Sequence, residues 1–122
     1  MGSTYDQRQA VGAHGENVAA DYLRSRGMQV LARNWRCRWG EIDIVAQDGE
    51  TLVFCEVKTR RTTTHGTPLE AITAQKAARL RRLAGAYLAQ QDRRAAGVRI
   101  DVVAVLLPRR GAASVTHVPG VS

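Results

Sequence analysis

The sequence predicts a single mixed α/β domain in which helices pack on a sheet. Three patterns lead to this fold class: helical spacing of apolar residues over 8–26, two alternating runs joined by Asp48-Gly49, and a nearly continuous apolar run over 99–107. A chain of 122 residues with 44% hydrophobic residues is long enough to bury one core. The expected order is α, β, β, β, α, β, in one domain over residues 8–107.

The two helices have recognisable ends. Gly27 closes the first helix, since glycine is common just past a helix C-terminus. A strand from about Gln29 to Trp35 follows. The second helix is expected to open at Thr67-Pro68, where a capping threonine precedes a proline at the first helical position. Its buried face then consists of residues at helical spacing: Leu69, Ile72, Lys76, Leu80, Leu83 and Tyr87.

The ends of the chain differ from the middle in composition. We expect a disordered N-terminus over residues 1–7, and a basic tail over 108–122 with an edge strand at Ser114 to Val118. Neither an apolar run of 18 residues nor a signal-peptide pattern occurs, so we expect a cytoplasmic protein without a membrane partner. Cys37 and Cys55 lack zinc-site spacing, and we interpret Cys55 as a buried free thiol.

The chain is strongly basic, with a net charge of +7 and 16 arginines among its 18 cations. Such a balance favours a polyanionic partner, because each neutralised phosphate releases counterions. Genome composition also produces arginine-rich chains, so charge by itself favours nucleic acid and an ordinary basic surface equally. Few aromatic residues lie near the basic stretches, which argues mildly against binding single strands by base stacking.

The hairpin around Asp48-Gly49 concentrates charge on one face. If the loop is centred on this pair, Glu41 faces Glu56 and Lys58 faces Trp39. Alternation then places two groups of side chains on the same face, apolar near the turn and charged at the far end: Trp39, Glu41, Asp43 and Val45 with Leu52, Phe54, Glu56 and Lys58. Ile42, Ile44, Val53, Cys55 and Val57 point the other way.

Three carboxylates and one lysine on this face suggest phosphodiester chemistry. Glu41 opposite Glu56, with Asp43 diagonal to them, is destabilising unless a cation compensates the charge. The pattern D-x12-E-x-K places Glu56 and Lys58 about 6.6 Å apart along one strand. Oxygen ligands suit Mg²⁺ or Mn²⁺, which would polarise a phosphoryl oxygen, while Lys58 would orient water or stabilise developing charge.

Plainer interpretations exist for each of these residues. The charged side chains of the hairpin could simply solubilise its exposed side, because E-x-K is a common tripeptide. Glu41 is either a base close to a metal or a charge at the strand edge. Glu16 lies at the rim of a packed helix face and can point into a site. Asp101 begins a buried strand, where it is expected to pair with an arginine or cap a helix.

Five segments, in order, closely resemble the YraN family of small bacterial proteins: Gly15-Glu16, Arg33-Asn34-Trp35-Arg36, Gly40–Val45, Glu56–Arg60, and Gln75-Lys76 through Leu80. That family resembles the PD-(D/E)xK nuclease superfamily, akin to archaeal Holliday junction resolvases. The resemblance therefore implies a restriction-endonuclease-like αβββαβ core. It also implies that Asp43, Glu56 and Lys58 occupy the metal and catalytic positions and that Glu16 completes the site. Ile42 stands where the superfamily name has proline.

The resulting expectation is an Mg²⁺- or Mn²⁺-dependent endonuclease acting on DNA, with branched or recombination DNA as the expected substrate and a homodimer to supply two active sites. The alternative is a non-catalytic nucleic-acid-binding or protein-interaction module that retains the nuclease fold. A phosphodiesterase acting on RNA or a nucleotide fits the same chemistry. Candidate phosphate contacts, each with a solvated-surface alternative, are Arg36, Arg60, Arg61, Arg79 and Arg82, together with Gln75, which resembles the helix glutamine of related nucleases.

Overall fold

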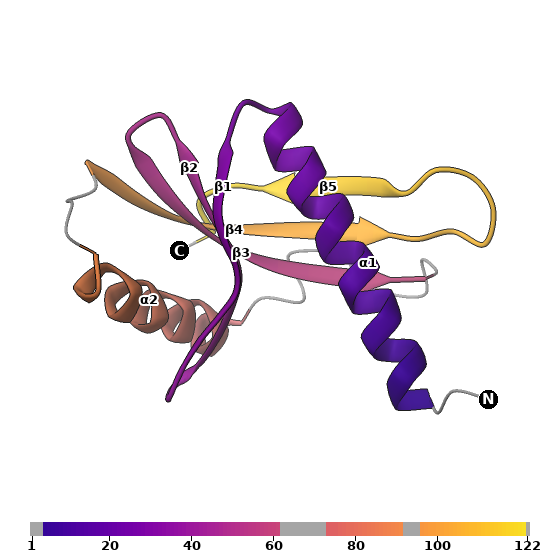
Figure 1. Ribbon diagram of the computed structural model, residues 1–122, viewed down its shortest axis with the longest axis horizontal. Coiled ribbons are helices and arrows are strands. Elements are labelled where there is room, and N and C mark those ends of the chain that lie inside the picture. The colour runs from indigo at the N-terminus through magenta and orange to yellow at the C-terminus, as the bar shows by residue number, and fades with distance from the viewer. Residues whose placement is uncertain (1–3, 62–72, 92–95, 122) are drawn as a thin grey trace.

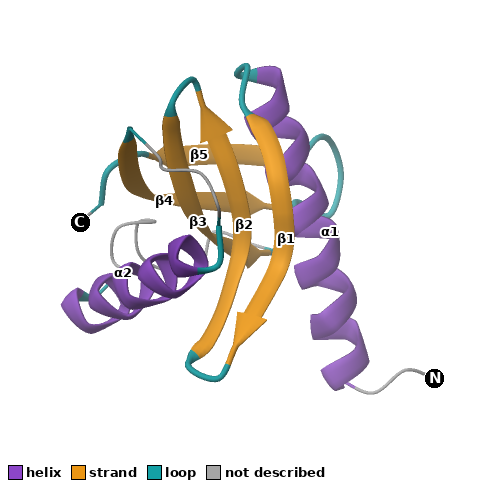
Figure 2. Cartoon of the chain, turned by 60° about the vertical axis from the view of Figure 1, so that its left-hand side comes forward, coloured by secondary structure: helices purple, strands orange, loops and turns teal. Residues whose placement is uncertain are grey.

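The computed structural model describes residues 4–61, 73–91 and 96–121. Its elements are α1 (Thr4–Ser25), β1 (Gln29–Cys37), β2 (Gly40–Asp48), β3 (Thr51–Arg60), α2 (Ala74–Ala89), β4 (Gly97–Leu106) and β5 (Ser114–Val118). The strands form one sheet in the order β1-β2-β3-β4-β5, with β3 and β4 parallel and the other neighbours antiparallel. α1 and α2 cover opposite faces of the sheet (Figures 1 and 2). The predicted mixed sheet with helices packed on it is confirmed.

The first helix packs on one face of the sheet through small and branched side chains. Ala19, Ala20 and Leu23 are fully buried in a core that also contains Ile44, Ala46, Val53, Cys55, Val103 and Val105 from the strands. The helix begins at Thr4, four residues before the expected start, so residues 4–7 are helical rather than part of an unstructured N-terminus. It ends as expected, because Gly27 has a φ of 88° and the Met28 N–H donates to the Leu23 carbonyl.

The second helix begins at Ala74 in the described residues. Thr73 precedes it in an extended conformation, and its hydroxyl accepts a hydrogen bond from the Lys76 N–H at 3.1 Å. Thr73 therefore caps the helix in the usual way for a threonine. The start expected at Thr67-Pro68 lies outside the described residues, as do Leu69 and Ile72 of the expected buried face.

The remaining apolar stripe of α2 packs on the other face of the sheet. Leu80, Leu83 and Tyr87 are buried, as predicted, in a core that includes Phe54. The Tyr87 ring meets Phe54 and Trp35 edge to face, with centroids 5.6 and 5.4 Å apart. Aromatic pairs prefer this geometry. α2 is therefore held against both β3 and the β1–β2 hairpin.

The hairpin between β2 and β3 turns later than predicted. Asp48 pairs with Thr51, so the loop is Gly49-Glu50 instead of being centred on Asp48-Gly49. Gly49 has a φ of 61°, which suits the first position of a two-residue loop. The expected pairing of Glu41 with Glu56 was therefore wrong. The observed register differs from the predicted one by two positions, so Val45 pairs with Phe54. Because a shift of two positions preserves alternation, the side chains near the turn keep their predicted faces.

Both strands of the β1–β2 hairpin change face midway. Ile42 and Val45 pack in the same core beneath α2, and so do Ala32 and Trp35, although strict alternation places residues three apart on opposite faces. Asn34 lies between Ala32 and Trp35 and has a φ of 52°, which asparagine tolerates better than most residues. The prediction that Ile42 shares a face with Ile44 and Val53 was therefore wrong.

The C-terminal strands close the sheet. β4 covers most of the buried strand predicted over 99–107, and β5 occupies Ser114–Val118. Asp101 is fully buried, and the Arg99 guanidinium donates to it at 2.9 and 3.0 Å, which confirms the expected arginine pairing. Nε2 of His117 lies 2.7 Å from the same carboxylate, which ties β5 to β4.

Two further expectations concern cysteine and membranes. Cys55 is fully buried as a free thiol, as predicted, and burial raises its pKa. Neither described helix combines the length and the apolar composition that crossing a membrane requires.

Candidate functional site

A glycine sets the position of the carboxylate on α1. Gly15 is buried, and a Cβ at this position would collide with the side chain of Thr59 on β3. Only glycine allows the helix to approach the strand so closely. The next residue, Glu16, is therefore held close to the sheet at the point where α1 crosses β3.

Three carboxylates converge between α1 and the β1–β2 hairpin. Glu16, Glu41 and Asp43 each place one oxygen within 4.8 Å of the others, and we call these residues the acidic cluster. They line a cavity of about 630 Å³ together with Asn34 and Arg36. Figure 2 shows α1 running alongside β1, with α2 on the opposite face of the sheet from α1. The change of face at Asn34 accompanies the turning of Glu41 and Asp43 toward α1.

Asp43 is the most perturbed member of the acidic cluster. The pKa of Asp43 is raised to about 6, first by burial and then by the charges of Glu16, Glu56 and Glu41. A hydrogen bond from the Val57 N–H, 2.8 Å long, opposes this rise. Asp43 therefore has the strongest electrostatic reason in this region to take up a proton or a cation.

Glu56 and Lys58 lie beside the acidic cluster instead of within it. Glu56 is only 8% exposed, and Nζ of Lys58 lies 3.3 Å from its Oε1. Its Oε2 is buried and has no hydrogen-bond partner among the described residues. An unsatisfied buried carboxylate oxygen is unfavourable. Glu56 and Lys58 form an ion pair. Of the four candidate carboxylates only three come close together, with Glu56 outside this group.

Arginines compensate part of the negative charge. NH2 of Arg33 lies 3.9 Å from Oε2 of Glu16, and Nε of Arg36 lies 3.1 Å from Oε2 of Glu41. Asp43 forms no ion pair in the described part of the chain. Reasoning from the sequence did not assign a role to Arg33, although the residue stands in the Arg33-Asn34-Trp35-Arg36 motif.

A second lysine reaches the Glu56 end of the site from α2. The pKa of Lys76 is lowered, chiefly by the nearby positive charge of Lys58 and by a hydrogen bond with it. From the sequence, Lys76 was expected only as part of the buried face of this helix. Its proximity to Lys58 depends on how α2 packs on β3, which no local pattern reveals.

The proposed phosphate contacts are exposed. Gln75, Arg79 and Arg82 lie on α2, and Arg60 and Arg61 lie at the end of β3. Arg36 is also exposed and reaches the acidic cluster through Glu41.

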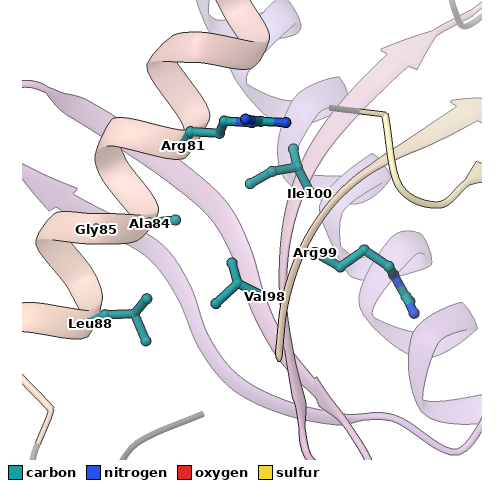
Figure 3. Close-up of a pocket in the computed structure, with 7 residues that line it drawn as sticks. All are labelled: Arg81, Ala84, Gly85, Leu88, Val98, Arg99 and Ile100. Atoms are coloured by element: carbon teal, nitrogen blue, oxygen red, sulfur yellow. The ribbon is translucent and has the colours of Figure 1, made fainter. Parts of the chain in front are cut away.

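A second cavity, of about 450 Å³, lies between α2 and β4 (Figure 3). Leu88 and Val98 point toward one another across it, while the Arg99 side chain points away. Its lining residues include no carboxylate, so this cavity offers no group for the chemistry considered above.

Fold and site together define a class: a mixed α/β protein whose five-stranded sheet lies between two helices, with carboxylates converging where α1 meets the β1–β2 hairpin. The chain belongs to the UPF0102 family, because residues 15–105 match the family model described as "Uncharacterised protein family UPF0102". The resemblance to YraN proteins is thereby confirmed at the level of the family.

The sequences of similar proteins match nearly the whole chain. A UPF0102 protein from Kineococcus radiotolerans is 60% identical over 116 residues, which cover 94% of this chain and 95% of the relative. One from Beutenbergia cavernae is 58% identical, covering 93% and 97%. One from Mycolicibacterium vanbaalenii is 54% identical, covering 96% and 97%.

Proposed function

We propose that this protein is a metal-dependent endonuclease that hydrolyses phosphodiester bonds in DNA. The observation that carries the proposal is the convergence of Glu16, Glu41 and Asp43, with the pKa of Asp43 raised to about 6. A perturbed carboxylate among like charges is a common mark of a functional site. The proposal includes a restriction-endonuclease-like αβββαβ core, and the element order from α1 to β4 agrees with it.

The donor set suits a hard divalent cation. Mg²⁺ and Mn²⁺ take oxygen ligands, and Glu16 and Asp43 supply them. The buried Oε2 of Glu56 is a third oxygen that a positive ion would stabilise. We assign Glu16 and Asp43 as metal ligands, with Glu41 adjacent as a further carboxylate. Glu56, which lies outside the acidic cluster, is the third ligand that the resemblance to the nuclease superfamily implies. A bound ion would polarise a phosphoryl oxygen and lower the pKa of a coordinated water.

Two lysine side chains would add positive charge to that of the metal ion. Lys58, paired with Glu56, is held by a buried partner and would donate to a phosphate oxygen or orient the attacking water. Lys76 adds a second positive charge close by. Because like charge lowers its pKa, Lys76 would gain from contact with an anionic phosphate.

Exposed basic residues on α2 and near the end of β3 support DNA as the substrate. Arg60 ends β3 and Arg61 follows it, and α2 presents Arg79 and Arg82 in exposed positions, with Gln75 in its first turn. Phosphate contacts of this kind give affinity without sequence preference. We infer branched or recombination DNA as the substrate structure, with a homodimer supplying two sites for paired cuts.

Cleavage of a DNA panel tests this proposal. Wild-type protein is incubated with branched, flapped, single-stranded and duplex DNA in Mg²⁺, Mn²⁺ or EDTA, beside Asp43→Asn and Lys58→Met. We expect metal-dependent cleavage that either substitution lowers by about 10²–10⁴-fold. Asp21→Asn is the matched control, because the Asp21 side chain is 80% exposed and pairs only locally with Arg24 in α1. Undiminished cleavage by Asp43→Asn would reject the assigned site.

One observation favours a second candidate, a nucleic-acid-binding module without turnover. Glu16, Glu41 and Glu56 each have a cationic side chain nearby, so protein cations supply part of the compensation that a metal would otherwise give. A protein that binds the panel but cleaves no member in either ion would support this candidate over the enzyme.

A further inference from the structure

The β1–β2 hairpin ends in an exposed aromatic residue. Cys37 pairs with Gly40, so Arg38-Trp39 forms the turn, which we call the hairpin tip. Trp39 is 51% exposed, and among the described residues only Val98, at 49%, is a comparably exposed large hydrophobic side chain. The Arg38 guanidinium lies 4.8 Å from the centre of the Trp39 ring. A cation therefore lies over an aromatic ring that is partly open to solvent.

The hairpin tip is held by the body of the protein. Gly40, which follows it, has a φ of 142°, and a Cβ there would lie 3.6 Å from Cδ1 of Leu83 on α2. Trp35, further along β1, packs edge to face on Tyr87. The turn thus extends from a hairpin that is anchored on α2, so the Trp39 ring is presented from a rigid element.

The hairpin tip is two residues from the acidic cluster along the chain. Trp39 precedes Glu41 by two positions, a backbone distance of roughly 6.6 Å. Arg36, on the other strand of the hairpin, connects to the same Glu41 through its ion pair. A DNA strand with one phosphate at the acidic cluster would therefore pass close to the Trp39 ring.

The charge around the tip favours a polyanion over an apolar protein surface. Arg36 lies just before the turn and Arg38 lies within it, and both are exposed, so their charges suit phosphates next to a nucleobase. A tryptophan next to exposed arginines matches the combination of aromatic stacking and basic charge that proteins use for unpaired strands. The tip is an exception to the scarcity of aromatic residues near basic stretches in this sequence.

We propose that the hairpin tip is a base-stacking site: Trp39, backed by Arg38, stacks on an unpaired nucleobase beside the phosphodiester presented to the acidic cluster. A base inside a continuous duplex is already stacked on both faces, so the protein would prefer flaps, branches and single strands. The inference rests on the proposed function for DNA as the partner, whereas its structural evidence comes from the hairpin tip.

Binding without turnover tests the inference. The Kd of the full chain in EDTA is measured by fluorescence anisotropy for a flapped DNA and for a continuous duplex of matched sequence. We expect Trp39→Ala to weaken binding of the flapped DNA about 5- to 150-fold and of the duplex less than twofold. Trp39→Phe, which keeps a ring, should retain most of the affinity. Val98→Ala is the matched control, since it removes the other exposed apolar side chain and should change neither Kd.

A spectroscopic readout places the contact. With 2-aminopurine at each unpaired position in turn, the wild-type protein should quench one position and Trp39→Ala none. Equal weakening on both DNAs, or no weakening on either, would overturn the proposal. A dimer in sedimentation that depends on Trp39, without DNA binding that depends on Trp39, would mean that the hairpin tip contacts a second copy of the chain. This outcome would also overturn the proposal. Because the binding assay contains EDTA and no metal, it tests base stacking independently of cleavage. Failure of the stacking proposal and failure of the proposed nuclease function can therefore be told apart.

Discussion

The Val57 N–H donates a hydrogen bond of 2.8 Å to the Asp43 carboxylate, just beyond the last ladder pair of β2 and β3, Ile44 with Cys55. Beyond the end of the ladder, an Asp43 carboxylate oxygen on β2 thus accepts the hydrogen bond from a backbone N–H of β3. Asp43 is thereby fixed to the same strand that carries Glu56 and Lys58. The relative position of the acidic cluster and the Glu56–Lys58 pair therefore depends on the backbone of the sheet.

Asp43→Asn should stabilise the metal-free protein at high pH. The folded-state pKa, about 6, lies above the ordinary value, so stability from the protonated carboxyl is complete below about pH 3.8 and is lost as the pH rises through 6. The amide oxygen can still accept from Val57. We expect a gain of about 1–3 kcal/mol in free energy of unfolding at pH 8 and almost none at pH 4.

Urea denaturation in EDTA at pH 8, 6 and 4 measures this difference. Asp21→Asn removes the same charge from an exposed position of α1 and should change stability by less than about 0.5 kcal/mol at every pH. A destabilised Asp43→Asn protein at pH 8 would show that the negative charge is favourable in the metal-free fold.

Mn²⁺ should raise the thermal stability of the wild-type protein through Asp43 and Glu16. An ion that binds only the folded state at 100 times its Kd adds about 2.7 kcal/mol. The shift should grow as the pH rises through 6, because ionised Asp43 is the better ligand. Thermal melts of Asp43→Asn and Glu16→Gln should show little response, and Asp21→Asn should respond like wild type. Equal shifts in all four proteins would point to binding elsewhere.

Lys58→Met should destabilise the protein more than the double change with Glu56→Gln. The single change leaves the buried Glu56 carboxylate without its cation, which should cost about 1–3 kcal/mol. Neutralising Glu56 removes that penalty, so most of the loss should be recovered. Urea melts of the two single variants and the double variant provide the cycle. Simple additivity of the two single effects would mean that the pair is not coupled.

Gly15→Ala should be disruptive, whereas Gly12→Ala in the same helix should not. A Cβ at residue 15 collides with Thr59, whereas a Cβ at residue 12 meets no atom within 4 Å. Overpacking predicts a loss of about 1–3 kcal/mol for Gly15→Ala, while Gly12→Ala should gain up to about 1 kcal/mol from helix propensity. Thermal melts compare the pair. Similar effects of both changes would contradict the close approach of α1 to β3.

DNA binding should weaken steeply with salt. If Arg79 and Arg82 each neutralise a phosphate, replacing either by glutamine should reduce the slope of log K against log salt by about 0.9. Arg24, exposed near the end of α1 and paired with Asp21, offers a control whose replacement should leave the slope unchanged. Anisotropy titrations between 50 and 300 mM salt, roughly, cover the useful range. A flat salt response would favour a protein partner.

Much of the fold could be read from local patterns. Alternation and helical spacing identify the strands and the buried stripe of α2, with Leu80, Leu83 and Tyr87. The D-x12-E-x-K spacing places Glu56 and Lys58 on one face, where they do form an ion pair. These features depend on residues near one another in the chain, so the sequence alone was enough to determine them.

The convergence of the carboxylates was decided by tertiary structure. The positive φ at Asn34 and the contact of Gly15 with Thr59 bring Glu41 and Asp43 to Glu16. Asparagine within a strand pattern hints at such a backbone, but alternation cannot show which helix each face will meet. That depends on close packing between segments far apart in the chain, and it is this packing that raises the pKa of Asp43 and leaves Glu56 outside the acidic cluster.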